Sequence, residues 1–110
     1  MKIKPIEVVR DECGFFIHPE YSKLLDELLG DREYPTIEEW ESFKNELGIK
    51  ISHVYLENDA SEEIVDSYFD GNIESCKDWI PAKPKGDDDW NILSIHDTEE
   101  GAVCLWFAKA

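Results

Sequence analysis

Residues 90–110 read WNILSIHDTEEGAVCLWFAKA, and this stretch at the end of the chain decides the fold. Two segments that alternate between apolar and other residues flank the sequence DTEEG, in which the glycine is free to adopt a positive φ. This pattern predicts a β-hairpin with a five-residue loop. We expect a register that pairs Leu93 with Leu105 and Ile95 with Val103, because it gathers the aliphatic side chains of both strands against the core.

The same register fixes the opposite face of the predicted hairpin. It places Ser94 across from Cys104 and His96 diagonal to Cys104, about 7–8 Å away at the backbone and within side-chain reach. His96 is therefore a candidate base for the Cys104 thiol, although a nucleophile also needs an orienting group and an oxyanion hole. Two other interpretations of this face stay open: a surface half covered by helices, and a partner-binding or homodimer patch built on Trp90 and Trp106.

Two amphipathic helices are expected in the first half of the chain. The first, PEYSKLLDELLG (residues 19–30), has a proline at its first helical position, apolar residues at i, i+3, i+4 and i+7, and a glycine stop. The second lies in PTIEEWESFKNELG (residues 35–48), where Thr36 and Glu39 form a capping box and a glycine again ends the helix.

Strands and a third helix complete the predicted elements. Residues 49–57 alternate and are rich in β-branched residues, so we expect a strand there. In NDASEEIVDSYFDG (residues 58–71), a cap at Asp59 or Ser61 and acidic residues in the first turn predict a helix. KIKPIEVVR (residues 2–10) is expected to form a first strand, which its proline places at an edge of the sheet.

Together these elements predict one α+β domain that spans residues 1–110. Their order is β-α-α-β-α-β-β, and the short apolar stretch at residues 15–18 is a further strand-like segment. We expect an antiparallel sheet of about four strands with three helices gathered on one face. The length of the chain suits a single domain, and its 42% hydrophobic residues supply enough apolar area for a core.

The charge of the chain is its strongest functional signal. It carries 26 acidic residues against 11 Lys and Arg, a net charge of −15. Such a surface attracts basic surfaces and repels nucleic acid and anionic membranes, since phosphate binding requires Lys and Arg. Plain solubility is the alternative explanation of the same charge. The excess is concentrated between Ile51 and Cys76, a segment without Lys or Arg whose acids are Glu57, Asp59, Glu62, Glu63, Asp66, Asp70 and Glu74.

No constellation of residues predicts a metal, a cofactor or phosphate chemistry. The three cysteines, Cys13, Cys76 and Cys104, are widely spread, and with the histidines they match no zinc spacing pattern. The DDD of GDDDW does not match the alternating ligands of an EF-hand loop. No glycine-rich loop precedes a helix, so no phosphate cradle is expected.

The sequence also predicts a cytoplasmic protein. The N-terminal residues lack the apolar segment of a signal peptide, and no apolar run approaches the roughly 18 residues of a membrane helix. An odd number of dispersed cysteines indicates reduced thiols rather than a disulfide framework, which fits a reducing compartment.

The C-terminal third carries a pattern that resembles a block in small uncharacterised proteins of bacterial, phage and prophage genomes. The pattern is W-x-P-x-x-P-x-G-x-x-x-W, then S-I-x-D-T-E-x-G, then a tryptophan. DECGFFIHPE, at residues 11–20, is similar to an earlier block of such proteins. The resemblance implies a mobile-element context and brings no catalytic residue with it. The matching residues are Trp79, Pro81, Pro84, Gly86, Trp90, Ser94, Ile95, Asp97, Thr98, Glu99, Gly101 and Trp106.

From the sequence we expect a non-enzymatic, acidic interaction protein whose partner is a protein with a basic surface. In its sharpest form, the segment from Glu57 to Glu74 imitates a row of phosphates and blocks a nuclease or a repressor. The alternative is a small enzyme or metal-binding protein that uses Cys104, His96 and Ser94 on the hairpin.

Overall fold

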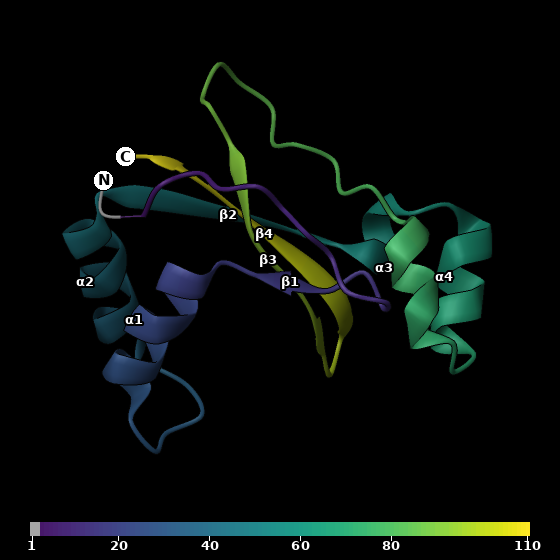
Figure 1. The fold of residues 1–110 in the computed structure, drawn as a ribbon, viewed down its shortest axis with the longest axis horizontal. Helices are drawn as coiled ribbons and strands as arrows, with labels where there is room; N and C mark the ends of the chain where they lie inside the picture. Colours follow the sequence, from purple (N-terminus) through teal and green to yellow (C-terminus); the bar gives the residue numbers. More distant parts are fainter. Residues whose placement is uncertain (1–2) are drawn as a thin grey trace.

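The computed structural model, which describes residues 3–110, is built around one four-stranded antiparallel sheet (Figure 1). The last two strands form the expected C-terminal hairpin. The predicted α+β class and four-stranded antiparallel sheet are therefore confirmed. The strands lie in the order β1-β3-β4-β2, with the bounds β1 (Phe16–Ile17), β2 (Ile49–Tyr55), β3 (Asn91–Thr98) and β4 (Gly101–Lys109).

Two helices at one end of the sheet match their predictions. α1 (Pro19–Leu29) begins after a capping histidine and ends at a glycine. α2 (Ile37–Leu47) begins with the expected capping box: Thr36 Oγ1 accepts the Glu39 N–H at 3.1 Å, and the Glu39 carboxylate accepts the Thr36 N–H at 2.9 Å. Local start and stop signals determine the bounds of both helices, so the sequence predicts them well.

Three short helices follow β2. The strand predicted over residues 49–57 ends at Tyr55, because the chain turns into a helix at the next residue. Of the two caps considered for the third predicted helix, Ser61 is the one used, and its Oγ accepts the Ile64 N–H at 3.4 Å. The three helices are α3 (Leu56–Asp59), α4 (Glu62–Phe69) and the 3-10 helix η1 (Ile73–Asp78).

The predicted first strand is wrong. Residues 3–10 pair with no strand, and β1, the strand-like segment noted after them, forms the sheet edge beside β3. Pro5 lacks the N–H that a ladder requires, and Val9 is 71% exposed, so this segment would gain little from a place in the sheet. Arg10 holds the segment instead, because its guanidinium donates to three backbone carbonyls at 2.6–2.7 Å.

The hairpin register differs from the prediction by one residue on β3. Ser94 lies opposite Leu105 and His96 opposite Val103, so the predicted pairing of Leu93 with Leu105 is not formed. The shift arises at a β-bulge, where Leu93 is an extra residue without a partner of its own on β4. Directly opposite residues share a face, so the bulge moves Ser94 and His96 to the face that the prediction gave to aliphatic side chains.

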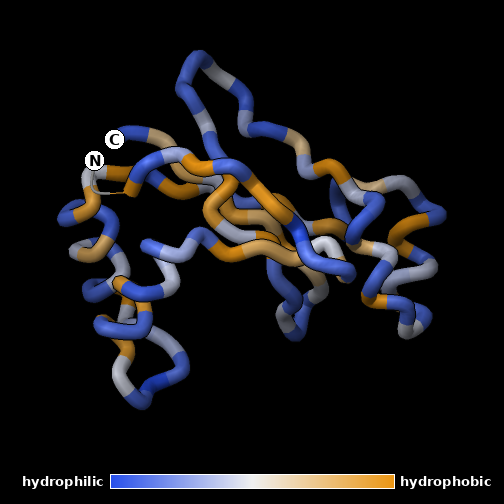
Figure 2. Tube along the Cα trace, viewed as in Figure 1, coloured by the Kyte–Doolittle hydropathy of each residue, from blue (hydrophilic) through white to orange (hydrophobic). Residues whose placement is uncertain are grey.

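The helices pack on both faces of the sheet, which differs from the expected arrangement on one face. Figure 1 shows α1 and α2 at one end of the sheet and α3 and α4 at the other. Alternate residues of β4 enter two separate clusters: Phe107 and Leu105 pack with α1 and α2, whereas Cys104 and Trp106 pack with α3, α4 and η1. A strand that is buried on both sides is apolar at nearly every position. Figure 2 shows this apolar centre between more polar outer segments.

Candidate partner-binding site on α4

The structure does not bring the three hairpin candidates together. Ser94 and His96 lie on the side of the sheet that packs against α1 and α2, whereas Cys104, opposite Ile95, lies on the α4 side. The Cys104 side chain is fully buried, and burial raises the pKa of its thiol to about 12. A thiol that is protonated and shielded from solvent is a poor nucleophile.

Ser94 and His96 do contact each other, with Ser94 Oγ 3.1 Å from His96 Nδ1. Ser94 is fully buried, so its hydroxyl is not accessible to a substrate in this structure. Desolvation lowers the pKa of His96 and thereby favours the neutral imidazole. Asp97 lies on the other face, where it accepts a hydrogen bond from the Tyr68 hydroxyl, and so it does not orient the imidazole as a triad acid would.

Trp90 and Trp106 belong to the core rather than to an exposed patch. They are 8% and 7% exposed and pack in the cluster that α3, α4 and η1 cover. Within residues 3–110, neither indole N–H has a hydrogen-bond partner. The partner-binding or homodimer face predicted on the hairpin is therefore covered in this structure.

The acidic segment is displayed by α4, whose inner side is fixed by packing. Ile64 packs against the cluster on that face of the sheet, and Tyr68 is buried there and bonds to Asp97 on β3. Phe69 packs against the hairpin turn, where a Cβ added to Gly101 would lie 2.9 Å from the Phe69 ring. These contacts determine which side of α4 faces solvent.

Four exposed carboxylates, those of Glu62, Glu63, Asp66 and Asp70, lie on the solvent side of α4 and at its end, and we call them the acidic face. Residues three and four apart are neighbours on a helix surface, so Glu63, Asp66 and Asp70 follow one stripe. The salt bridges within residues 3–110 lie elsewhere in the molecule, and none involves the acidic face. The charge of this stripe is therefore not neutralised by a neighbouring cation.

The other three acids of the predicted segment differ from one another. Glu57 and Glu74 are exposed on α3 and η1. Asp59 is half-buried, and one of its carboxylate oxygens accepts both the Trp79 indole N–H and the Ala82 N–H, each at 2.9 Å. Asp59 thus ties α3 to the segment after η1 and is not free to contact a partner.

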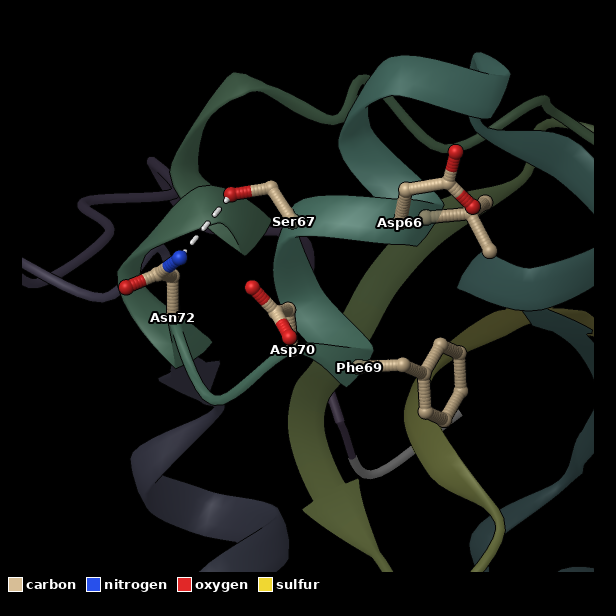
Figure 3. A pocket seen from close by; sticks show the side chains of 6 residues that line it. Asp66, Ser67, Phe69, Asp70 and Asn72 are labelled. Carbon is tan, nitrogen blue, oxygen red and sulfur yellow. Dashed lines mark hydrogen bonds between the residues drawn. The ribbon is translucent and has the colours of Figure 1, made fainter.

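Two pockets flank the acidic face. Figure 3 shows the larger, about 640 Å³, with the Asp70 carboxylate between the Phe69 ring and Asn72, whose amide donates to Ser67 Oγ. The pocket is lined by Val65, Asp66, Ser67, Phe69, Asp70 and Asn72. The second, about 320 Å³, is lined by Ser61, Glu63, Ile64, Ser67, Ser75 and Asp78.

The unit formed by α4 and η1 offers anionic and apolar contacts side by side. Phe69 and Ile73 are 52% and 43% exposed. The hydroxyls of Ser67 and Ser75 lie 2.6 Å apart and satisfy each other. The three-residue spacing of Phe69 from Asp66 is the sequence signal that could have placed its ring beside the acidic face.

The part of the chain that the structure describes holds no group of three or more side chains arranged for a metal ion. None of the helices in residues 3–110 has both the length and the apolar character needed to span a membrane. No family model, no curated protein and no solved structure matches the chain.

Proposed function

We propose that this protein is a non-enzymatic interaction protein that binds the basic surface of another protein through the acidic face. The observation that carries the proposal is the row of exposed carboxylates on α4 without a salt-bridge partner within residues 3–110. A net charge of −15 accelerates encounter with basic partners. The exposed Phe69 adds an apolar contact beside Asp66 and Asp70, as expected of a docking surface with a polar rim.

In its sharper form, the proposal is that the acidic face occupies the nucleic-acid site of its partner. From Glu62 to Asp70 a helix rises about 12 Å at 1.5 Å per residue, so the four carboxylates lie on average about 4 Å apart along the axis, in steps of about 1.5, 4.5 and 6 Å. The phosphates of one DNA strand are about 3.4 Å apart along the duplex axis. The similar charge density supports a nuclease or repressor as the partner, and the resemblance to mobile-element proteins provides a setting for it.

The proposal includes a cytoplasmic site of action. The three cysteines are unpaired in the structure. Unpaired thiols are typical of a compartment in which glutathione and thioredoxin keep cysteines reduced.

The test compares two variants of equal net charge, used as immobilised baits beside the wild-type protein. Each variant neutralises three exposed acids. The two sets are matched at the start of a helix, because Glu38 is the second residue of α2 and Glu63 is the second residue of α4. The acidic-face variant carries Glu63→Gln, Asp66→Asn and Asp70→Asn. The control variant carries Asp26→Asn, Glu38→Gln and Glu46→Gln.

The baits are incubated at low salt with lysate of the source cells. The wild type and the control variant are expected to retain the same basic proteins, which elute as salt screens the charges, whereas the acidic-face variant loses them. Duplex DNA added to a captured nucleic-acid-binding partner should release it. Retention of no basic protein, or equal retention by the two variants, would contradict the proposal.

A further inference from the structure

A third surface combines two aromatic rings with two carboxylates. A pocket of about 230 Å³ opens between the loop after α1, the end of β2 and the turn of the hairpin. These segments lie far apart in the sequence, so only the fold brings their side chains together. The lining residues are Tyr34, Tyr55, Thr98, Glu99 and Glu100.

The two rings are not used by the core. Tyr34 is 74% exposed, and neither Tyr34 nor Tyr55 belongs to either of the two core clusters. Tyr55 is half-buried, and its ring meets that of His53 edge-on at a centroid distance of 5.6 Å. This contact limits the positions open to the Tyr55 ring, so one wall of the pocket is held in place.

The hairpin turn holds the carboxylates at the pocket. Thr98 Oγ1 donates to the Gly101 carbonyl at 2.7 Å and accepts the Glu100 N–H at 3.1 Å. Gly101 has a φ of 103° and packs against Phe69, which fixes the turn against α4. Glu99 and Glu100 are exposed, and no Lys or Arg is among the described residues that line the pocket. The pocket is therefore anionic as well as aromatic.

We propose that this pocket binds an organic cation, namely the guanidinium or ammonium group of an arginine or lysine side chain on a partner protein. A cation within about 6 Å of a ring centroid is attracted by the negative face of the ring. A carboxylate beside it adds a charge-assisted hydrogen bond. An anion is repelled, and a neutral apolar group gains neither contribution. The cationic chemistry follows from the pocket alone, whereas a basic protein as its source rests on the proposed function.

The test is a titration of the ¹⁵N-labelled protein followed by amide chemical shifts. The cationic probes are N-acetyl-arginine methylamide and N-acetyl-lysine methylamide, and N-acetyl-norleucine methylamide is the neutral probe. Both cations should shift the amides of Tyr34, Tyr55 and residues 98–100 saturably, and the neutral probe should not. Because a guanidinium stacks on rings and an ammonium does not, tighter binding of the arginine probe would identify the guanidinium as the preferred group.

Variants separate the pocket from general electrostatics. Tyr34→Ala combined with Glu99→Gln should weaken binding of the preferred probe at least about fivefold, since it removes one ring and one charge. Both residues are exposed, so the fold should be retained. The control, Asp26→Asn, removes one exposed charge outside both the acidic face and this pocket and should leave the titration unchanged.

The absence of saturable shifts with either cation, an equal response to the neutral probe, or an unchanged titration in the double variant would overturn the inference. The two proposals fail separately. If the wild-type protein captures no basic protein but binds the cationic probes as expected, the proposed function alone is overturned. If the cationic probes give no saturable amide shifts but the wild-type protein captures basic proteins as expected, only the cation pocket is overturned.

Discussion

Replacing Asp59 with alanine tests whether this acid is structural, as its contacts indicate, rather than part of the binding surface. The substitution removes the acceptor of two N–H groups, and one of them belongs to Trp79, which is 2% exposed. A hydrogen bond to a charged group contributes about 1.5–3 kcal/mol, and we take the lower value because Asp59 is only half-buried. The expected loss in the free energy of unfolding is about 3 kcal/mol.

The loss should be visible as a lower melting temperature. With an unfolding entropy of about 2.1 cal/mol/K per residue, a chain of 110 residues should melt about 13 °C lower. Circular dichroism during heating and urea titrations followed by tryptophan fluorescence measure this change. Asp59→Asn, which keeps one acceptor oxygen, should lose roughly half as much.

Asp66→Ala is the matched control for the Asp59 variant. Asp66 is exposed and belongs to none of the salt bridges within residues 3–110, so its loss should change stability by no more than about 0.5 kcal/mol. If the Asp59 and Asp66 variants melt within about 2 °C of each other, Asp59 does not fasten α3 to the segment after η1.

Three further predictions concern single side chains. Burial raises the pKa of the Cys104 thiol from 9.0 to about 12, and only the thiolate reacts with iodoacetamide. At pH 8, Cys104 of the native protein should therefore be alkylated about a thousandfold more slowly than Cys104 of the unfolded chain. Comparable rates would contradict its burial. The hydrogen bonds from Arg32 hold the pKa of Glu39 at about 2, below its ordinary 4.5. The stability that this pair contributes is therefore present above pH 4.5 and is lost as the pH falls toward 2. In urea titrations, the difference in the free energy of unfolding between the wild type and Glu39→Gln should shrink over that range. Gly101→Ala forces a Cβ against Phe69 at a positive φ and should lower stability by about 1–3 kcal/mol in the same titrations, and an unchanged midpoint would refute that contact.

The sequence predicted best where the signals are local. The capping box at Thr36 and Glu39 and the glycine stops gave α1 and α2 with their bounds, because capping depends on residues only a few positions apart. The hairpin was predicted for the same reason. Its register was not, since alternation cannot reveal that Leu93 is an extra residue with no partner across the ladder.

The placement of the helices on two faces depended on a signal that the prediction did not use. The segment AVCLWFA in β4 is a nearly continuous apolar run, which is typical of a strand buried on both sides. The prediction left Trp106 and Cys104 on a face that was at most half covered by helices, because it treated the run as alternating. The tryptophan patch is lost because helices cover both sides, whereas the Cys–His pair is lost because the bulge at Leu93 moves His96 to the other face.

For the candidate site, the sequence identified the acids but not which of them are free. Asp59 is engaged by Trp79, a contact across twenty residues that no local pattern indicates. The pocket beside Tyr34 and Glu99 is likewise assembled only by the fold. Of the seven acids that the sequence singled out, Glu63, Asp66 and Asp70 lie three and four residues apart on or at the end of α4 and are exposed in the structure.

In the proposed function, the acidic face, rather than the total charge of the chain, contacts a basic partner. The most direct measurement is the dissociation constant of the purified partner for the wild type, the acidic-face variant and the control variant over a series of salt concentrations. We predict that the acidic-face variant binds at least about tenfold more weakly at low salt and has a shallower salt dependence, while the control variant behaves like the wild type. Equal weakening of the two variants would show that only net charge matters and would contradict the claim.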